Sequence, residues 1–313
     1  MLPALSIIIV NWNVRELLRA CLLSLAHAPG GADAEIILVD SASTDGSVDM
    51  LRRDFPSVRL IACGSNVGFS AGNNLALAAA SADLVLCLNP DTEIVGDALQ
   101  VMAAYLRANP AAAVVGPQLR YPDGAVQSSR RRFPTFLTAL LESTILQRWF
   151  PRNRWLARYY VADVPDNITQ DVDWLMGACF MLRRSLFTQL GGFDESFFMY
   201  SEELDWMRRI KLAGWRVVFL PDAVVIHHEG KSSEQVAPLR HIRFQTSKIR
   251  YFYKYHGVLA AFALRSFLWL TYWFQLCEEA GKWLLGHKRP LRRERVAAYW
   301  QVLKSGLRSG RPA

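Results

Sequence analysis

Residues 84–91 read Leu-Val-Leu-Cys-Leu-Asn-Pro-Asp, an apolar run that ends in Asn89-Pro90-Asp91. A short run rich in Leu and Val and closed by a polar turn predicts a buried strand. A carboxylate at the carboxyl end of a strand, fixed by a proline, is well placed to hold Mg²⁺ or Mn²⁺ with diphosphate oxygens as co-ligands. An ordinary Asx-Pro turn explains the same three residues equally well.

Apolar runs of similar length recur along the first hundred residues. They predict strands over Leu5–Val10, Glu35–Asp40, Val58–Cys63 and, around the opening stretch, Asp83–Asn89. Helices are expected over Ala71–Ala80, over Gly96–Ala108, and where one helical face carries Leu17, Leu18, Cys21, Leu22 and Leu25. Strands that alternate with helices predict an α/β fold with a mostly parallel sheet, which binds ligands beyond the carboxyl ends of its strands.

The pattern is less regular after residue 120. The stretch Tyr121–Asp173 mixes a basic triplet, Arg130-Arg131-Arg132, with aromatic residues and prolines, and we expect it to face a substrate. Regular elements then return: a strand-like run over Trp174–Arg183 that contains Gly177, a helix over Ser201–Ala213, and short strands over Val217–Leu220 and Val224–His227. We therefore place the first domain at residues 1–235.

The C-terminal region, residues 236–313, is helical, aromatic and basic, and we expect it to associate with a membrane. Its stretch Val258–Cys277 is almost wholly apolar and just long enough to span a bilayer. Arg265 near the middle of this stretch counts against a clean span. We therefore expect a helix that lies in or dips into the membrane surface, with a spanning helix and a soluble packing helix as alternatives.

The composition narrows the class of protein. The 313 residues carry a formal net charge of +8, which favours an anionic partner: a nucleic acid, a phospholipid or a phosphorylated substrate. The five cysteines are scattered and include no CxxC pair, so neither a disulfide framework nor a zinc ribbon is expected. The run Leu5–Val10 has no basic stretch before it and no small-residue cleavage site after it, so a signal peptide is not expected.

Polar residues follow the first strands at the edge where a parallel sheet brings strand ends together. Asn11-Trp12-Asn13 ends the first strand and Asp40 the second, and a carboxylate with backbone groups there suits the edge of a nucleobase. Simple capping and turning of the chain is the alternative. The segment Asn66–Asn74 contains Gly72 and other glycines that let a backbone approach a ligand closely, although a plain helix-entry turn has the same composition.

Two more clusters lie further along the chain. The segment Gly191–Trp206 holds five acids within twelve residues among aromatic side chains, and one of them suits a general base whose pKa a half-apolar pocket raises. Glu202 and Asp205 share a helix face there, and first-turn acids that favour the helix dipole are the alternative. The segment His227–Ser232 fails both the HExxH zinc pattern and the P-loop. Two interpretations of this segment remain open. Either a single histidine is a metal ligand, with Lys231 and Ser232 near phosphate, or the histidine is structural.

The order of these clusters over residues 4–235 resembles family 2 glycosyltransferases, and within that family the bacterial rhamnosyltransferase branch. The segments that carry the resemblance are Asn11-Trp12-Asn13, Asp40…Asp45-Gly46-Ser47, Asn66…Gly72-Asn73-Asn74, Asn89-Pro90-Asp91, Gly192-Phe193-Asp194-Glu195, Glu202-Glu203-Leu204-Asp205 and His227…Gly230-Lys231-Ser232. The resemblance implies a GT-A fold, in which a nucleotide-binding sheet is merged with an acceptor-binding half, and transfer with inversion at the anomeric carbon.

The resemblance also implies a role for each cluster. Donor binding falls to Asn11, Trp12, Asn13, Asp40, Asn66, Gly72, Asn89 and Asp91, and acceptor binding to Trp174, Gly177, Glu202 and Asp205. Asp91 would be the metal-binding acid of the family's DxD motif, with His227 as companion ligand of Mg²⁺ or Mn²⁺. Glu203 would be the catalytic base. The sequence departs from the family at Asn89, which replaces the first acid of the motif, and at Glu202-Glu203, where the family usually has Glu-Asp.

The favoured donor is dTDP-rhamnose, with UDP- or GDP-sugars as alternatives, and the expected acceptor is a lipid-linked saccharide of cell-envelope polysaccharide assembly. We expect the enzyme in the cytoplasm, at the inner face of a bacterial membrane. One rival interpretation is a nucleotide-sugar-binding protein without activity, against which the intact Glu203, Asp91 and His227 argue. Another is a nucleic-acid-binding protein that uses Arg130–Arg132 and the basic tail, but no recognised nucleic-acid module is present.

Overall fold

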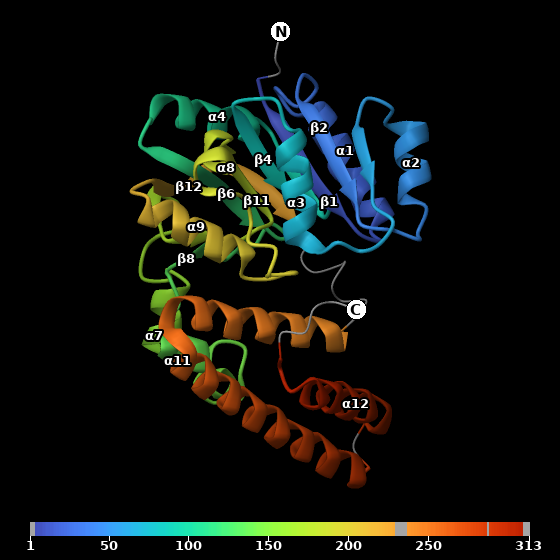
Figure 1. Cartoon of the computed structure of the whole chain (residues 1–313), viewed down its shortest axis with the longest axis vertical. Helices are drawn as coiled ribbons and strands as arrows, with labels where there is room; N and C mark the ends of the chain where they lie inside the picture. Colours follow the sequence, from blue (N-terminus) through green and yellow to red (C-terminus); the bar gives the residue numbers. More distant parts are fainter. Residues whose placement is uncertain (1–3, 229–236, 287, 309–313) are drawn as a thin grey trace. The chain divides into compact units, whose positions relative to one another are not determined.

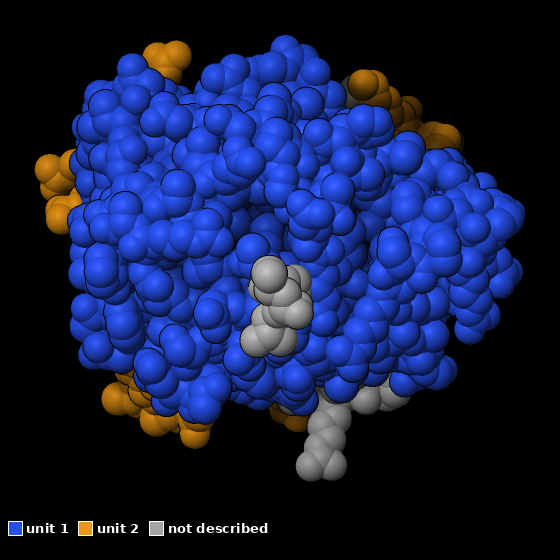
Figure 2. All heavy atoms as spheres, turned by 90° about the horizontal axis from the view of Figure 1, so that it is seen from above, with its two compact units in different colours: residues 1–133, 160–198, 202–232 blue, residues 134–159, 199–201, 233–313 orange. Residues whose placement is uncertain are grey.

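The computed structural model describes residues 4–228, 237–286 and 288–308, which form two compact units (Figure 1, Figure 2). The first unit contains the described residues of 1–133, 160–198 and 202–232. The second contains those of 134–159, 199–201 and 233–313. Residues 134–159, expected in the first domain, therefore belong with the C-terminal helices.

The first unit is built on a sheet with the strand order β3-β2-β1-β4-β11-β6-β12-β5. Its first half is parallel: β1 (Ser6–Asn11) lies between β2 (Glu35–Asp40) and β4 (Leu84–Leu88), and β3 (Arg59–Ala62) pairs with β2. These are the four strands expected from the apolar runs. Their carboxyl ends meet at one edge of the sheet, where a ligand of a parallel sheet binds.

The other half of the sheet is mixed. The strand β11 (Cys179–Arg183) is antiparallel to β4 and to β6 (Ala112–Arg120). The strand β12 (Arg216–His227) runs parallel to β6 and antiparallel to β5 (Thr92–Val95). The parallel sheet expected from the sequence is thus confirmed for the first half of the unit and becomes mixed in the second.

Two expected elements differ in detail. The run Trp174–Arg183 forms two strands, β10 (Trp174–Leu175) and β11, because Gly177 lies in a turn between them. The two strands expected around residues 217–220 and 224–227 are one strand, β12, with a register shift between Leu220 and Val224. Three short strands complete the unit: β7 (Val126–Gln127), β8 (Arg130–Arg131) and β9 (Gln170–Val172).

Helices cover both faces of this sheet. They are α1 (Arg15–His27), α2 (Ser47–Asp54), α3 (Gly68–Ala79), α4 (Ala98–Ala108), α8 (Ser185–Leu190) and α9 (Glu202–Leu212). The apolar face expected for the first helix is present, since Leu18, Cys21, Leu22 and Leu25 of α1 are all buried. Residues of α1, α2 and α4 pack into one hydrophobic cluster, and residues of α3, α8 and α9 into another.

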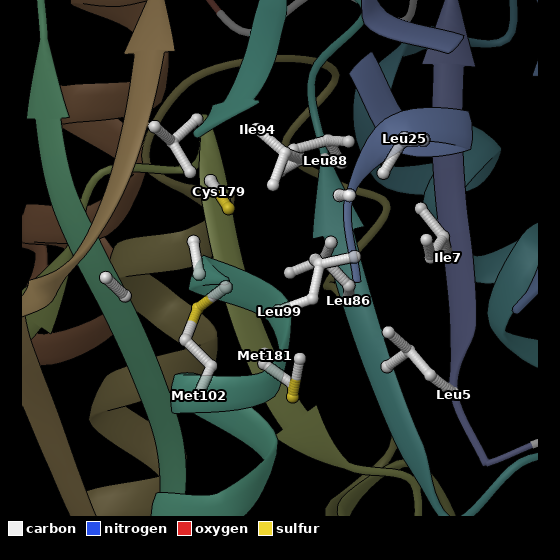
Figure 3. Packing of buried hydrophobic residues seen from close by; sticks show 14 of the residues in the cluster. Leu5, Ile7, Leu25, Leu86, Leu88, Ile94, Leu99, Met102, Cys179 and Met181 are labelled. Carbon is white, nitrogen blue, oxygen red and sulfur yellow. The ribbon is translucent and has the colours of Figure 1, made fainter. Parts of the chain in front are cut away.

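The strand β4 lies between these two clusters. Leu84, Leu86 and Leu88 belong to the first cluster, where Figure 3 shows Leu86 and Leu88 near Ile7 and Leu99. The alternate residues Val85 and Cys87 belong to the second. Packing on both faces holds β4 rigidly, so Asn89-Pro90-Asp91 directly follows a strand end whose position is fixed.

The second unit is helical. Its helices are α5 (Phe136–Leu141), α6 (Ile145–Trp149), α7 (Arg154–Tyr159), α11 (Ala237–Leu284) and α12 (Arg289–Ser305). Gly257, with φ 83° and ψ 176°, breaks α11 into two segments. By length and composition α11 is apolar enough to cross a membrane. Its second segment packs against α12 and buries Leu264, Leu268 and Tyr272.

Gly72 gives a stability prediction, because a Cβ at this position of α3 would lie 2.8 Å from Cγ1 of Val10 on β1. Gly72→Ala therefore overpacks the contact between helix and sheet, and we expect it to lower the free energy of unfolding by about 1–3 kcal/mol. Urea denaturation measures the change. Gly64→Ala is the control, because a Cβ there meets open space; equal stability of the two variants would contradict the packing role of Gly72.

Candidate active site

The ends of β1 and β2 form a hydrogen-bonded group. Asn11 Nδ2 donates to Asp40 Oδ2 (2.8 Å) and to Ser43 Oγ (3.1 Å), and the backbone N–H of Ser43 donates to Asp40 Oδ1 (2.8 Å). Asn11 and Asp40 are both buried. The Oδ1 atom of Asn11 is buried too, and no described residue donates a hydrogen bond to it. The prediction that the strand ends bring Asn11 and Asp40 together is confirmed, and contact of this group with a donor stays a prediction.

The neighbouring turns are tied to this group. Asn13 has a positive φ of 52°, and its Oδ1 accepts from the backbone N–H of Thr44 (2.7 Å). Asn66 Oδ1 accepts from the N–H of Gly68 (3.0 Å) and from Ser41 Oγ (3.3 Å), which holds the turn that enters α3. Trp12 is half-buried beside them. These contacts give Asn13 and Asn66 a structural role, and their contact with a donor stays a prediction.

Gly72 and its neighbours serve the packing of α3. The close approach that Gly72 permits is to Val10 of the sheet, which is a structural reason for a glycine at this position. Asn74 Nδ2 donates to the carbonyl of Phe193 and to Glu195 Oε1, both at 2.9 Å. The helix thus anchors the acidic segment that precedes α9.

Asp91 and His227 meet at the edge of the sheet. The pairing of β12 with β5 sets His227 opposite Thr92, and Nε2 of His227 lies 3.4 Å from Oδ1 of Asp91. Both side chains are buried. Nδ1 of His227 is 2.8 Å from Oε1 of Gln127, an amide oxygen that can only accept. Nδ1 therefore carries the proton, and in the neutral imidazole Nε2 is an acceptor aimed at a carboxylate oxygen.

Two acceptors at this distance repel each other unless a cation or a proton lies between them. The Asp91–His227 pair therefore fits a divalent metal ion. Asn89, two residues before Asp91, adds a buried Oδ1 atom to which no described residue donates. Within the described residues no group of three or more His, Cys, Asp and Glu could hold a metal ion. The pair is therefore suited to an ion whose remaining ligands come from elsewhere, such as diphosphate oxygens and water.

Glu203 lies in the first turn of α9 (Glu202–Leu212). Its Oε1 accepts from the backbone N–H of Gly177 (3.3 Å), in the turn between β10 and β11. Its Oε2 is buried, and no described residue donates a hydrogen bond to it. One oxygen is thus held in place while the other can accept the proton of a hydroxyl.

Glu202 and Glu203 differ in their surroundings. Burial, and after it the charge of Glu203, raises the pKa of Glu202 well above its ordinary value. Burial also raises the pKa of Glu203, but the N–H groups of Glu203, Gly177 and Leu204 and the charge of Arg131 oppose the rise. Burial therefore favours the protonated form of Glu202 more strongly than that of Glu203, whose neighbouring donors and cation favour its ionised form.

The basic triplet is part of the fold. Arg130 and Arg131 are buried, and β8, which they form, pairs with β10. The guanidinium of Arg131 lies 4.6 Å from the ring centroid of Tyr160 and 6.0 Å from that of Trp174, and Arg132 pairs with Asp163 at 2.7 Å. The side chains of Arg130 and Arg131 are built into the first unit, and the expectation that this stretch faces a substrate stays a prediction.

The predicted acceptor residues fall into two groups. Gly177 and Glu202 lie at or beside Glu203. Trp174 is half-buried, and its Nε1 donates to the carbonyl of Arg132 (3.0 Å). Asp205 is fully buried and pairs with Arg209 at 3.0 Å, whose Nη1 and Nη2 donate to the carbonyls of Leu190 and Gly192. The structure gives Asp205 a packing role, and its contact with an acceptor stays a prediction.

Sequence analysis did not predict Gln127 as the partner of His227, nor Arg131 as the cation that acts on Glu203. Gln127 lies in the two-residue strand β7 and belongs to no sequence motif, although it comes shortly before the basic triplet. Arg131 was recognised as basic, but its burial between two rings has no sequence signal. Lys231 and Ser232, expected near phosphate, lie outside the described residues.

The chain matches the family model described as glycosyl transferase family 2 over residues 6–206. Over 244 residues it is 32% identical to an N-acetylglucosaminyl-diphospho-decaprenol L-rhamnosyltransferase of Mycobacterium tuberculosis, and this match covers 74% of this chain and 78% of that protein. It is 30% identical over 176 residues to rhamnosyltransferase WbbL of Escherichia coli K12, which covers 53% of this chain and 62% of WbbL. The solved mannosyltransferase PcManGT of Pyrobaculum calidifontis, in complex with GDP-Man and Mn²⁺, matches 98% of this chain and 87% of its own with a TM-score of 0.56 and 18% identity.

Glu202 gives a prediction for stability against pH. Because its pKa is raised in the folded protein, its contribution to stability is present below the unfolded-state pKa and is lost as the pH rises toward the folded-state pKa. Glu202→Gln removes this loss. Between the unfolded-state and the folded-state pKa of Glu202, we therefore expect the free energy of unfolding of the variant, relative to that of the wild type, to rise by about 1.4 kcal/mol per pH unit. Denaturation at several pH values measures it, with the exposed Asp222→Asn as control. A difference that does not change with pH would refute the assignment.

Proposed function

The chain belongs to glycosyl transferase family 2, and from this premise we propose that it is a metal-dependent, inverting glycosyltransferase. Its fold is the GT-A fold that the resemblance implied. The observation that carries the proposal is the unpartnered Oε2 of Glu203, a buried carboxylate oxygen whose companion oxygen is fixed by Gly177. A single base of this kind deprotonates the acceptor hydroxyl as it attacks, and one displacement inverts the anomeric carbon.

Asp91 and His227 are the residues that would hold Mg²⁺ or Mn²⁺. A bound divalent ion would neutralise the charge that develops on the leaving nucleotide diphosphate. Gln127 fixes the tautomer of His227 that presents Nε2 as a ligand, as second partners of metal-bound histidines do. The Mn²⁺ of the solved mannosyltransferase supports a divalent ion in this fold.

The donor is proposed to be a nucleotide-diphosphate sugar, with dTDP-rhamnose favoured. The free Oδ1 of Asn11 is an acceptor at the base-binding edge, and it suits a base with a ring N–H, as thymine, uracil and guanine have. Two of the similar proteins are named as rhamnosyltransferases, which supports rhamnose over other sugars. UDP- and GDP-sugars are the alternatives that the same acceptor would bind.

The acceptor is proposed to be a lipid-linked saccharide of cell-envelope polysaccharide assembly. The name of the mycobacterial relative includes a diphospho-decaprenol carrier, which supports a lipid-linked acceptor. In the second unit, α11 exposes large apolar side chains at helical spacing, among them Leu259, Phe262, Leu270 and Trp273, which are separated by three, eight and three residues. A stripe of this kind suits a helix that lies in a membrane surface. It supports a proposed membrane location, for which the inner face is the side where nucleotide sugars are expected.

Two rival functions are less well supported. A nucleotide-sugar-binding protein without activity has no need for a buried acid with one fixed and one unpartnered oxygen, which Glu203 provides. A nucleic-acid-binding protein needs an exposed basic surface. The basic triplet does not supply one, because Arg130 and Arg131 are buried and Arg132 pairs with Asp163. The exposed arginines of α12 belong to no recognised nucleic-acid module.

The proposal is tested first by incubation with a panel of nucleotide sugars and a membrane lipid extract, following release of the nucleoside diphosphate. We expect release that depends on the lipid extract and is greatest with dTDP-rhamnose. Release with no donor of the panel, although donors bind, would favour the inactive binding protein.

Glu203→Gln tests the base directly. The amide keeps the shape of the side chain but cannot take up the proton, so we expect kcat to fall by about 10²–10⁴-fold while the Kd of the donor is unchanged. Initial rates and calorimetric binding measure the two quantities. Glu195→Gln, an exposed acid in the same segment, is the matched control. Near-normal turnover of the Glu203 variant would remove Glu203 from this role.

Metal removal tests the Asp91–His227 pair. EDTA is expected to stop transfer, and Mg²⁺ or Mn²⁺ to restore it. Gln127→Leu, which frees Nδ1 of His227, should raise the metal concentration needed for half-maximal activity by about 10–100-fold, whereas the exposed Gln100→Leu should not. Full activity in EDTA would contradict the proposed site.

A further inference from the structure

A cleft of about 480 Å³ lies wholly within the second unit, at the bend of α11. Its lining comes from both sides of the break at Gly257 and from the turn that follows α12. The positive φ of Gly257 allows the two segments of α11 to diverge, which opens the cleft between them. A volume of this size accommodates a small-molecule group.

The polar part of the cleft is cationic. Arg250, Arg265 and Arg308 are among its lining residues, and no Asp or Glu is. Nε of Arg265 donates to the carbonyl of Gly306 at 2.8 Å, which fixes this guanidinium beside the cleft. Guanidinium groups that line one cleft favour an anion, and a phosphate in particular because their donors match its oxygens.

The rim of the cleft is apolar. Val258 and Phe262 line it and are 64% and 68% exposed, and Leu259 between them is 81% exposed. Such residues are unfavourable in water and are stabilised by contact with hydrocarbon. A free phosphate or a nucleic-acid backbone offers no hydrocarbon for this rim, whereas a phospholipid offers both a phosphate and acyl chains.

We propose that this cleft binds the phosphate of an anionic membrane phospholipid, which no head-group cation neutralises, with the three arginines on the head group and the side chains of residues 258, 259 and 262 among the acyl chains. The inference rests on the proposed membrane association of the second unit. It involves none of the donor, metal or base chemistry of the first unit, so either can fail alone. The site would bind the unit to anionic lipid specifically, beyond general attraction of a basic protein.

Flotation with lipid vesicles tests the proposal on the full chain. The variant Arg250→Gln/Arg308→Gln is compared with Arg289→Gln/Arg293→Gln, which removes the same charge from exposed positions of α12 outside the cleft. On phosphatidylcholine vesicles that contain phosphatidylglycerol, we expect the cleft variant to bind about tenfold more weakly than the control variant. On pure phosphatidylcholine the two should bind equally.

Equal losses in the two variants on anionic vesicles would overturn the proposal in favour of diffuse charge attraction. Arg308 is exposed, so Arg308→Gln alone keeps the fold and should show a smaller loss in the same direction. Inorganic phosphate, compared with chloride at equal ionic strength, should not release the wild type from anionic vesicles. Release to the level of the cleft variant would assign the cleft to free phosphate instead.

Discussion

The pairing of β12 with β5 places His227 opposite Thr92 and thereby brings its ring to Asp91. Because Nδ1 of His227 donates its hydrogen bond to Gln127 Oε1, Nε2 and a carboxylate oxygen of Asp91 face each other 3.4 Å apart in a buried place. Two acceptors in contact without a cation or proton between them repel each other and lack a hydrogen bond. The proposed metal site follows from this single constraint. The rigid strand β4, buried on both faces, holds one side of it in place.

The neighbouring acids of α9 show how one segment can supply two kinds of carboxyl group. Glu202 is buried beside a second carboxylate, which favours its protonated form. Burial raises the pKa of Glu203 too, but backbone donors and the charge of Arg131 oppose this rise, and Oε2 of Glu203 has no hydrogen-bond partner among the described residues. The chain enters this helix through Tyr200 and Ser201, which have positive φ values of 71° and 65°. Strain of this kind next to an unpartnered acid is typical of a functional site.

Apolar periodicity was sufficient to predict β1 to β4 and α1, because strands buried on both faces read as continuous apolar runs. It failed at Gly177, where a turn is hidden inside an apolar stretch, and at residues 134–159, whose association with the C-terminal helices is a long-range packing effect. Among the site residues, Asn11, Asp40, Asp91, Glu203 and His227 stand in recognisable segments. Gln127 and Arg131 do not, because their roles depend on which partners the fold brings to them. The glycine at position 72 has its evident role in packing against Val10.

Asp91 and His227 are proposed to share one divalent ion. The anomalous scattering of manganese, in crystals grown with Mn²⁺ and a nucleoside diphosphate, tests this directly. We expect an anomalous peak in contact with both Asp91 and Nε2 of His227. A peak elsewhere, with Nε2 of His227 hydrogen-bonded directly to the Asp91 carboxylate, would contradict it.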